Sequence, residues 1–104
     1  MTAPTPLHVG DEIVAALAGT IRRLVVMTDA DDFIYLDDGV AFRIMENATG
    51  CREVHITHLY NGRCRMEFGE IDNLEYQPRT VRHSVATEGL REAFEQTTEL
   101  YLSL

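Results

Sequence analysis

The chain of 104 residues has no tryptophan, no lysine and only two cysteines, and no apolar stretch is long enough to cross a bilayer. Its N-terminus lacks the basic start and apolar core of a secretory signal. Two cysteines in a chain without such a signal indicate reduced thiols at Cys51 and Cys64 rather than a disulfide. We therefore expect one cytoplasmic domain, residues 1–104, with no membrane association and with residues 1–9 as a flexible N-terminal arm.

Basic charge is scarce, because nine arginines stand against 17 acidic residues and the net charge is -8. Clustered basic residues drive binding to phosphate, so this balance argues against direct nucleic-acid binding. A macromolecular partner is instead expected to be a protein with a basic surface.

Motifs of recognised chemistry are also missing. The sequence has no glycine-rich phosphate loop, no G-x-S-x-G elbow and no H-E-x-x-H helix. We therefore predict neither a cofactor nor an enzyme activity.

Apolar residues recur at helical spacing near the N-terminus, and β-branched runs follow them. Ile13, Leu17, Ile21 and Leu24 lie on one helical face and predict a helix over residues 11–24. The runs LVVM, FIYL and VAFRIM, separated by acidic turns, predict three strands within residues 24–45.

The length of the first hairpin loop decides which side chains share a face. A three-residue loop over residues 37–39 pairs Leu36 with Val40. A two-residue loop would place Tyr35 opposite Phe42. We prefer the three-residue loop because it gathers one apolar face: Ile34, Leu36, Val40, Phe42 and Ile44.

The second hairpin, over residues 53–71, follows the same logic. A two-residue Asn-Gly loop would put its two apolar sets on opposite faces. A type I turn over Tyr60 and Asn61 with Gly62 at positive φ keeps the sets together. The predicted cross-strand pairs are Val54 with Phe68, Ile56 with Met66 and His58 with Cys64.

The C-terminal part reads as an irregular stretch over residues 69–79 and then a helix from about Ser84 to the end of the chain. Its apolar stripe has seven members at about 100° per residue: Leu90, Ala93, Phe94, Thr97, Leu100, Tyr101 and Leu104. These elements predict an α+β fold, with an antiparallel sheet of four to five strands in two hairpins packed against an N-terminal and a C-terminal helix.

Cys51, His55, His58 and Cys64 are spaced closely enough to suggest metal ligands. Strand geometry opposes this, because the two histidines are three residues apart and point to opposite faces of a regular strand. We predict no metal site. The cross-strand pair His58 and Cys64 is kept as a reactive-site alternative, although a cysteine at the end of an apolar row more often packs in the core.

Aspartates 29, 31 and 32 suggest a calcium loop, but the positions that follow do not match an EF-hand. Asp37 and Asp38 lie at the other end of the predicted strand and cannot complete the cluster. We interpret all five as solvated turn residues.

Four glutamates, Glu88, Glu92, Glu95 and Glu99, lie on the side of the last helix opposite its apolar stripe. They span about 16 Å at a rise of about 1.5 Å per residue. Such a ridge suits a basic partner, although it is also typical of the solvated face of an amphipathic helix. Leu102 projects toward the same side, so we group it with the four glutamates as the partner-binding residues and expect a homodimer.

Three segments, VVMTDADDFIYLDDGVAFRI, EVHITHLYNGRCRMEFGEI and LREAFEQTTELYLSL, are similar to small uncharacterised proteins encoded by bacteriophages and other mobile elements. The resemblance covers roughly residues 12–104 and rests on packing and turn patterns: M-T-x-A, V-x-I-T, M-E-F-G and L-Y-x-x-L. The Asp-rich turns and the thiol-imidazole hairpin depart from it. It implies the cytoplasm of a host bacterium but no established activity.

Three functions are compatible with these observations. The first is a small acidic, non-enzymatic phage protein that inhibits a host protein, such as a defence component, through its acidic helix. The second is a structural or assembly protein that acts as a homodimer. The third is an enzyme that uses His58 and Cys64.

Overall fold

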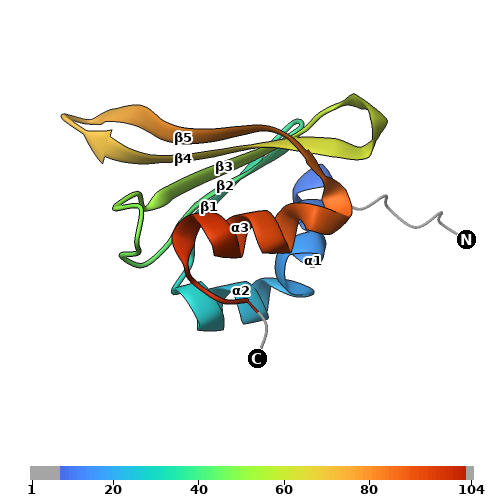
Figure 1. Ribbon diagram of the computed structural model, residues 1–104, viewed down its shortest axis with the longest axis horizontal. Helices are drawn as coiled ribbons and strands as arrows, with labels where there is room; N and C mark the ends of the chain where they lie inside the picture. The colour runs from blue at the N-terminus through green and yellow to red at the C-terminus, as the bar shows by residue number, and fades with distance from the viewer. Residues whose placement is uncertain (1–7, 103–104) are drawn as a thin grey trace, which may run out of the picture.

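Five antiparallel strands in sequence order form the sheet, and helices from both ends of the chain cover one of its faces (Figure 1). The computed structural model describes residues 8–102. Its elements are α1 Val9–Ala18, α2 Ile21–Thr28, β1 Asp31–Leu36, β2 Gly39–Arg43, β3 Glu53–His58, β4 Arg63–Asp72, β5 Glu75–Ala86 and α3 Leu90–Thr98. The α+β class, the antiparallel sheet and the terminal helices are confirmed.

The N-terminal helix begins earlier than expected and breaks in the middle. The His8 Nδ1 atom accepts a hydrogen bond from the Gly10 N–H, which caps α1. The prediction of an arm over residues 1–9 is therefore wrong for residues 8 and 9, while residues 1–7 lie outside the described residues. At the other end, Gly19 adopts a φ of 83° and ends α1.

A second helix, α2, replaces the rest of the predicted helix and the first predicted strand. The Thr20 hydroxyl accepts from the Arg23 N–H and starts it, so LVVM is helical. Leu24 is fully buried, whereas Ile21 is 43% exposed. The prediction of one helix over residues 11–24 followed by a strand is therefore wrong. The helix breaks at Gly19, so Ile21 no longer shares a buried face with Ile13 and Leu17.

The hairpin of β1 and β2 closes on a two-residue loop, Asp37-Asp38, with Leu36 opposite Gly39. The predicted three-residue loop is wrong, and the reason lies in how Gly39 packs against β3. A Cβ atom on Gly39 would collide with the backbone carbonyl of Ile56, so glycine is needed in the strand rather than in the turn. Ile34 consequently lies opposite Ala41 instead of Phe42. Tyr35 lies opposite Val40, so the pairing of Tyr35 with Phe42 that we expected of a two-residue loop is wrong as well.

A bulge in β1 also changes which of its side chains face the core. Asp32 has a φ of 52°, and the register of β1 against β2 shifts between Asp31 and Ile34. Phe33 packs against the core and stacks on Phe42, with their ring centroids 5.5 Å apart. Ile34 is 59% exposed, so its predicted place in the apolar face is wrong.

The second hairpin has the predicted register. Val54 lies opposite Phe68, and the other two predicted pairs are also present. Gly62 has a φ of 71°, as expected. Asn61 also has a positive φ, of 63°, so the turn is not type I, but the loop still contains three residues.

The stretch predicted to be irregular is a long hairpin of β4 and β5. Asn73 and Leu74 form its turn, both with positive φ. Strand β5 then continues to Ala86, where it pairs with Arg63. The prediction of a helix from about Ser84 is wrong because pairing with β4 holds this segment in the sheet, and α3 begins only at Leu90.

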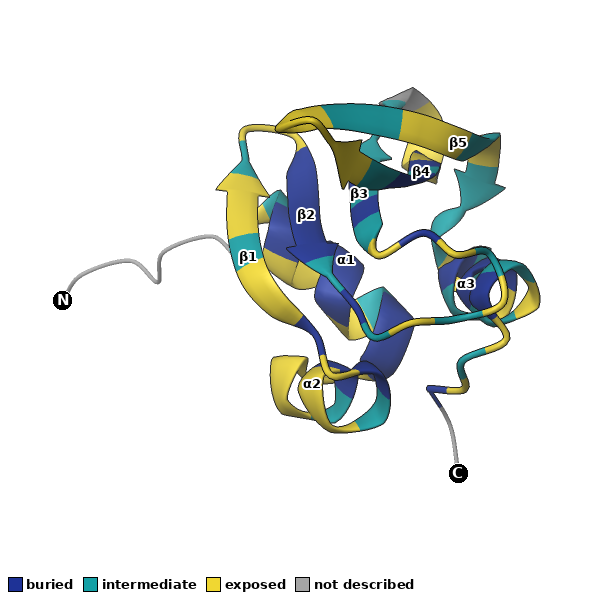
Figure 2. Ribbon diagram, turned by 90° about the vertical axis from the view of Figure 1, so that its left-hand side faces the viewer, coloured by how far each residue is buried: buried dark blue, intermediate teal, exposed yellow. Residues whose placement is uncertain are grey.

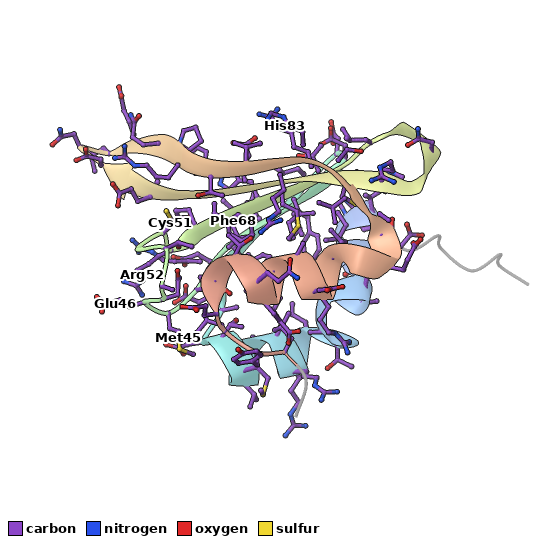
Figure 3. All side chains as sticks on the ribbon, viewed as in Figure 1. Met45, Glu46, Cys51, Arg52, Phe68 and His83 are labelled. Atoms are coloured by element: carbon purple, nitrogen blue, oxygen red, sulfur yellow. The ribbon has the colours of Figure 1, made fainter. Side chains whose placement is uncertain are left out.

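The core lies between the sheet and the helices. Phe68 points from β4 toward α3, where its ring centroid is 6.2 Å from that of Phe94 (Figure 3). Leu90, Ala93 and Phe94 are buried as the stripe predicts, whereas Tyr101 is 64% exposed and Leu104 lies outside the described residues. Strand β2 and the inner side of α1 are buried, and β1 and α2 are largely exposed (Figure 2). No helix within residues 8–102 is long and apolar enough to span a membrane.

Candidate functional site

The predicted glutamate ridge is divided by the way the last helix begins and ends. Glu92 and Glu95 lie in α3, but Glu88 belongs to a short 3-10 turn, Thr87–Gly89. Glu99 follows the last turn of α3 with a φ of 60°, which is left-handed. One continuous helical ridge of four carboxylates is therefore wrong, although Glu88, Glu92 and Glu99 are all exposed.

Leu102 lies in the core and not on the surface. It has no exposed area, and its N–H donates a 2.7 Å hydrogen bond to the Glu95 Oε2 atom. The prediction that Leu102 projects outward beside the glutamates is wrong, because the helix ends at Thr98 and the chain folds back. Glu95 thus holds the C-terminal segment in place and is only half exposed.

His58 and Cys64 are cross-strand neighbours, as predicted. Cys64 is fully buried, and burial raises the pKa of its thiol, which a hydrogen bond with Thr87 offsets only in part. A nucleophilic cysteine needs the opposite, a lowered pKa and solvent access. Cys51 is also a free, buried thiol. Within residues 8–102, no three His, Cys, Asp or Glu side chains are arranged so that they could hold a metal ion.

His55 lies on the outer face of the sheet, away from the helices. Its ring stacks flat on Tyr76 of β5, with 4.1 Å between centroids and 8° between planes. The Tyr76 hydroxyl donates to the Glu67 carboxylate at 3.3 Å. Burial lowers the pKa of His55 against the opposing charges of Glu67 and Glu53, and burial together with Glu67 raises the pKa of Tyr76. Strand alternation in the sequence predicts that His55 faces away from His58. It does not reveal Tyr76, which lies in the stretch predicted to be irregular.

Beside this stack, the outer face is hollowed. The hollow has a volume of about 580 Å³ and is lined by residues of β1, β2 and β3: Asp32, Phe33, Ile34, Leu36, Ala41, Phe42, Glu53 and His55. Ala41 lies opposite both Ile34 and His55 and supplies only a methyl group between them. Its small size leaves a depression between these side chains, and four of its lining residues belong to β1, the edge strand of the sheet.

The carboxylates divide into two groups by burial. Four of the 17 are half-buried, and all four are engaged: Glu53, Glu67 and Glu70 each form an ion pair with an arginine, and Glu95 accepts from Leu102. The other 13 are exposed, and none of them forms an ion pair within the described part of the chain. The exposed carboxylates are therefore available to a partner, because no ion pair among the described residues occupies them.

Five of these exposed carboxylates flank one strand. Asp29, Asp31 and Asp32 lie at the start of β1, and Asp37 and Asp38 follow its end. The sequence placed them correctly at the two ends of a strand. It gave no sign that this strand is an edge, because strand order depends on the whole sheet.

The comparisons with known proteins found no similarity to report. The chain matches no protein-family model, no curated protein and no solved structure.

Proposed function

We propose that the chain is a non-enzymatic binding protein whose exposed carboxylates attract a protein partner with a basic surface. One observation carries this proposal: among residues 8–102, none of the 13 exposed carboxylates forms an ion pair, while every half-buried carboxylate is engaged. Charges that stabilise the fold are expected to be paired or hydrogen-bonded, whereas unpaired surface charge of one sign steers a partner of the other sign.

Two acidic surfaces are available for this role. The α3 surface consists of Glu88, Glu92 and Glu99, and the β1 surface consists of the five aspartates at the ends of β1. In Figure 2, α3 and β1 lie on opposite sides of the molecule, so the two surfaces can be changed independently. Glu95 is left out of the α3 surface because it holds Leu102.

The experiment captures partners from a bacterial lysate, identifies them, and repeats the binding with the purified partner. A variant with Glu88, Glu92 and Glu99 changed to Arg is compared with one in which Asp32, Asp37 and Asp38 are changed to Arg. We expect at least one variant to lose binding and the wild-type affinity to fall as salt rises. Binding that survives both reversals, with no dependence on salt, would contradict the proposal. That the partner is a host protein inhibited by a phage protein is a prediction from the resemblance alone.

An assembly role as a homodimer is the second candidate, and α2 favours it. Val26 is 71% exposed, and Ile21 and Val25 are 43% and 40% exposed, so this eight-residue helix turns an apolar face to solvent. A dimer through α2 would dissociate when Val26 is changed to Glu. If the wild type sediments as a monomer at high concentration, the homodimer function is contradicted.

A further inference from the structure

Strand β1 has a partner on one side only. It is the first strand in the order β1-β2-β3-β4-β5, and within residues 8–102 it pairs with β2 alone. Residues along an antiparallel pair alternate between those that bond across the pair and those whose N–H and C=O point the other way. Gly39 closes the two-residue loop against Leu36, and Ile34 lies opposite Ala41. Tyr35, between them, therefore directs its backbone N–H and C=O to the free edge.

Aspartates gather at both ends of the same edge strand, where Arg43, opposite Asp31 and paired with Glu53, is the basic residue of β2. Between Arg23 and Arg43 the sequence contains five aspartates and no basic residue. Asp32 and Asp37 are five residues apart, which corresponds to roughly 17 Å along an extended strand. Carboxylates thus flank both ends of a short edge strand.

The middle of β1 is apolar on the outer face. Ile34 is 59% exposed, and Leu36 is half-buried. Both line the hollow together with Ala41. A strand laid along β1 would cover Ile34 and place its own apolar side chain at the mouth of this hollow.

We propose that β1 accepts an extended segment of a basic protein as a sixth strand. The Tyr35 backbone supplies the hydrogen bonds at the centre, basic side chains at both ends of the segment face the aspartates, and an apolar side chain packs on Ile34 and Leu36. This is β-strand addition, in which main-chain bonds give affinity and side-chain contacts give specificity. The inference rests on the proposed function and assigns it a surface and a partner conformation.

A second copy of this chain does not fit the same edge. If β1 met another β1 in either direction, aspartates would face aspartates, and like charges directly opposite are unfavourable. The other edge strand, β5, contains Pro78, which has no N–H to donate. Its Arg79 is bonded to Glu70 and its Arg82 to Thr97.

The experiment uses a synthetic peptide, Arg-Arg-Thr-Val-Thr-Val-Arg-Arg, capped at both ends and labelled with a fluorophore. Affinity is measured by fluorescence anisotropy. A matched peptide of identical sequence carries N-methyl groups on alternate central residues, which keeps the charge but blocks main-chain pairing. We expect the N-methylated peptide to bind at least tenfold more weakly. Hydrogen exchange of the Tyr35 amide should slow when the unmodified peptide is added.

The protein variants are matched in charge. Asp32, Asp37 and Asp38 are changed together to Asn, a residue that also tolerates the left-handed backbone at position 32. The control changes Glu88, Glu92 and Glu99 to Gln and removes three charges from the opposite side of the molecule. We expect the aspartate variant to lose about tenfold in affinity, from three exposed charge pairs, and the glutamate variant to lose about twofold or less.

Equal binding of both peptides, or equal effects of the two variants, would overturn the strand-addition inference. Self-association of the protein that competes with the peptide would also overturn it, in favour of a second copy on β1. These failures differ from failure of the proposed function, because a partner captured through the α3 surface would leave that function standing without strand addition.

Discussion

Changing Leu102 to Ala tests whether the C-terminal segment belongs to the core. The side chain has no exposed area, although it lies near the end of the chain and beyond the last helical turn. Truncating a buried leucine to alanine costs about 2 to 5 kcal/mol, depending on how far the surroundings collapse into the cavity. A segment close to the chain terminus can relax, so we expect the lower part of this range, about 2 to 3 kcal/mol.

The hydrogen bond from the Leu102 N–H to Glu95 gives a second, smaller perturbation. Changing Glu95 to Ala removes the acceptor, and we expect a loss of about 1 kcal/mol because a typical hydrogen bond contributes about that much. Changing Glu92 to Ala is the matched control, since Glu92 is exposed on the same helix and its carboxylate accepts a hydrogen bond from the exposed Gln96 side chain. We expect that change to stay within about 0.5 kcal/mol.

The assay is urea unfolding followed by circular dichroism. With a slope of about 1 to 1.5 kcal/mol per molar urea, the Leu102→Ala variant should unfold at roughly 2 M less urea than the wild type, with an unchanged slope. The neighbouring Tyr101→Ala variant should change little, because that side chain is 64% exposed. A Leu102→Ala effect no larger than the Tyr101→Ala effect would refute the burial argument and return Leu102 to the surface.

Four further outcomes are expected. Gly39→Ala should cost about 2 kcal/mol or more in urea unfolding, because its Cβ would meet the backbone carbonyl of Ile56, and a smaller loss would contradict the two-residue loop. The pKa of His55 is lowered on folding, so stability should be full above about pH 6.5 and fall at lower pH, and His55→Gln should flatten that slope in unfolding at pH 5 to 7.5. The pKa of Tyr76 is raised on folding, so stability should be full below about pH 10 and fall above it, and a Tyr76→Phe variant with the same alkaline loss would contradict this. The Cys64 thiol should react with a disulfide reagent only as fast as the protein unfolds, whereas reaction faster than free cysteine would support the enzyme alternative.

Local patterns were sufficient where near neighbours alone decide the structure. The register of β3 with β4 follows from alternating apolar residues on both sides of a loop that contains Gly62, because a slip by one residue would put the two apolar sets on opposite faces. The buried stripe of α3 at Leu90, Ala93 and Phe94 follows from helical periodicity in the same way. These features could be predicted because their cause lies within a few residues of one another in the chain.

The candidate site was only half predictable. The sequence placed the aspartates at the two ends of a strand and His55 on the outer face of the sheet. It could not show that β1 is an edge strand or that Tyr76 stacks on His55, because both depend on how distant strands are ordered. The hollow likewise requires Ala41 to lie between Ile34 and His55, which are brought together by two separate strand pairings.

By itself, the sequence determined an acidic α+β chain, the hairpin of β3 and β4, and an amphipathic C-terminal helix. Composition and short-range periodicity are sufficient for these features. Tertiary structure decided the rest. Pairing with β4 made residues 84–86 a strand, and the break at Gly19 turned LVVM into a helix with an exposed apolar face. The chain reversal after Thr98 buried Leu102 against the expectation from helical geometry. The strand over residues 84–86 is decided by pairing with a distant strand, whereas the helix break and the chain reversal use local caps whose effect on burial appears only in the folded chain.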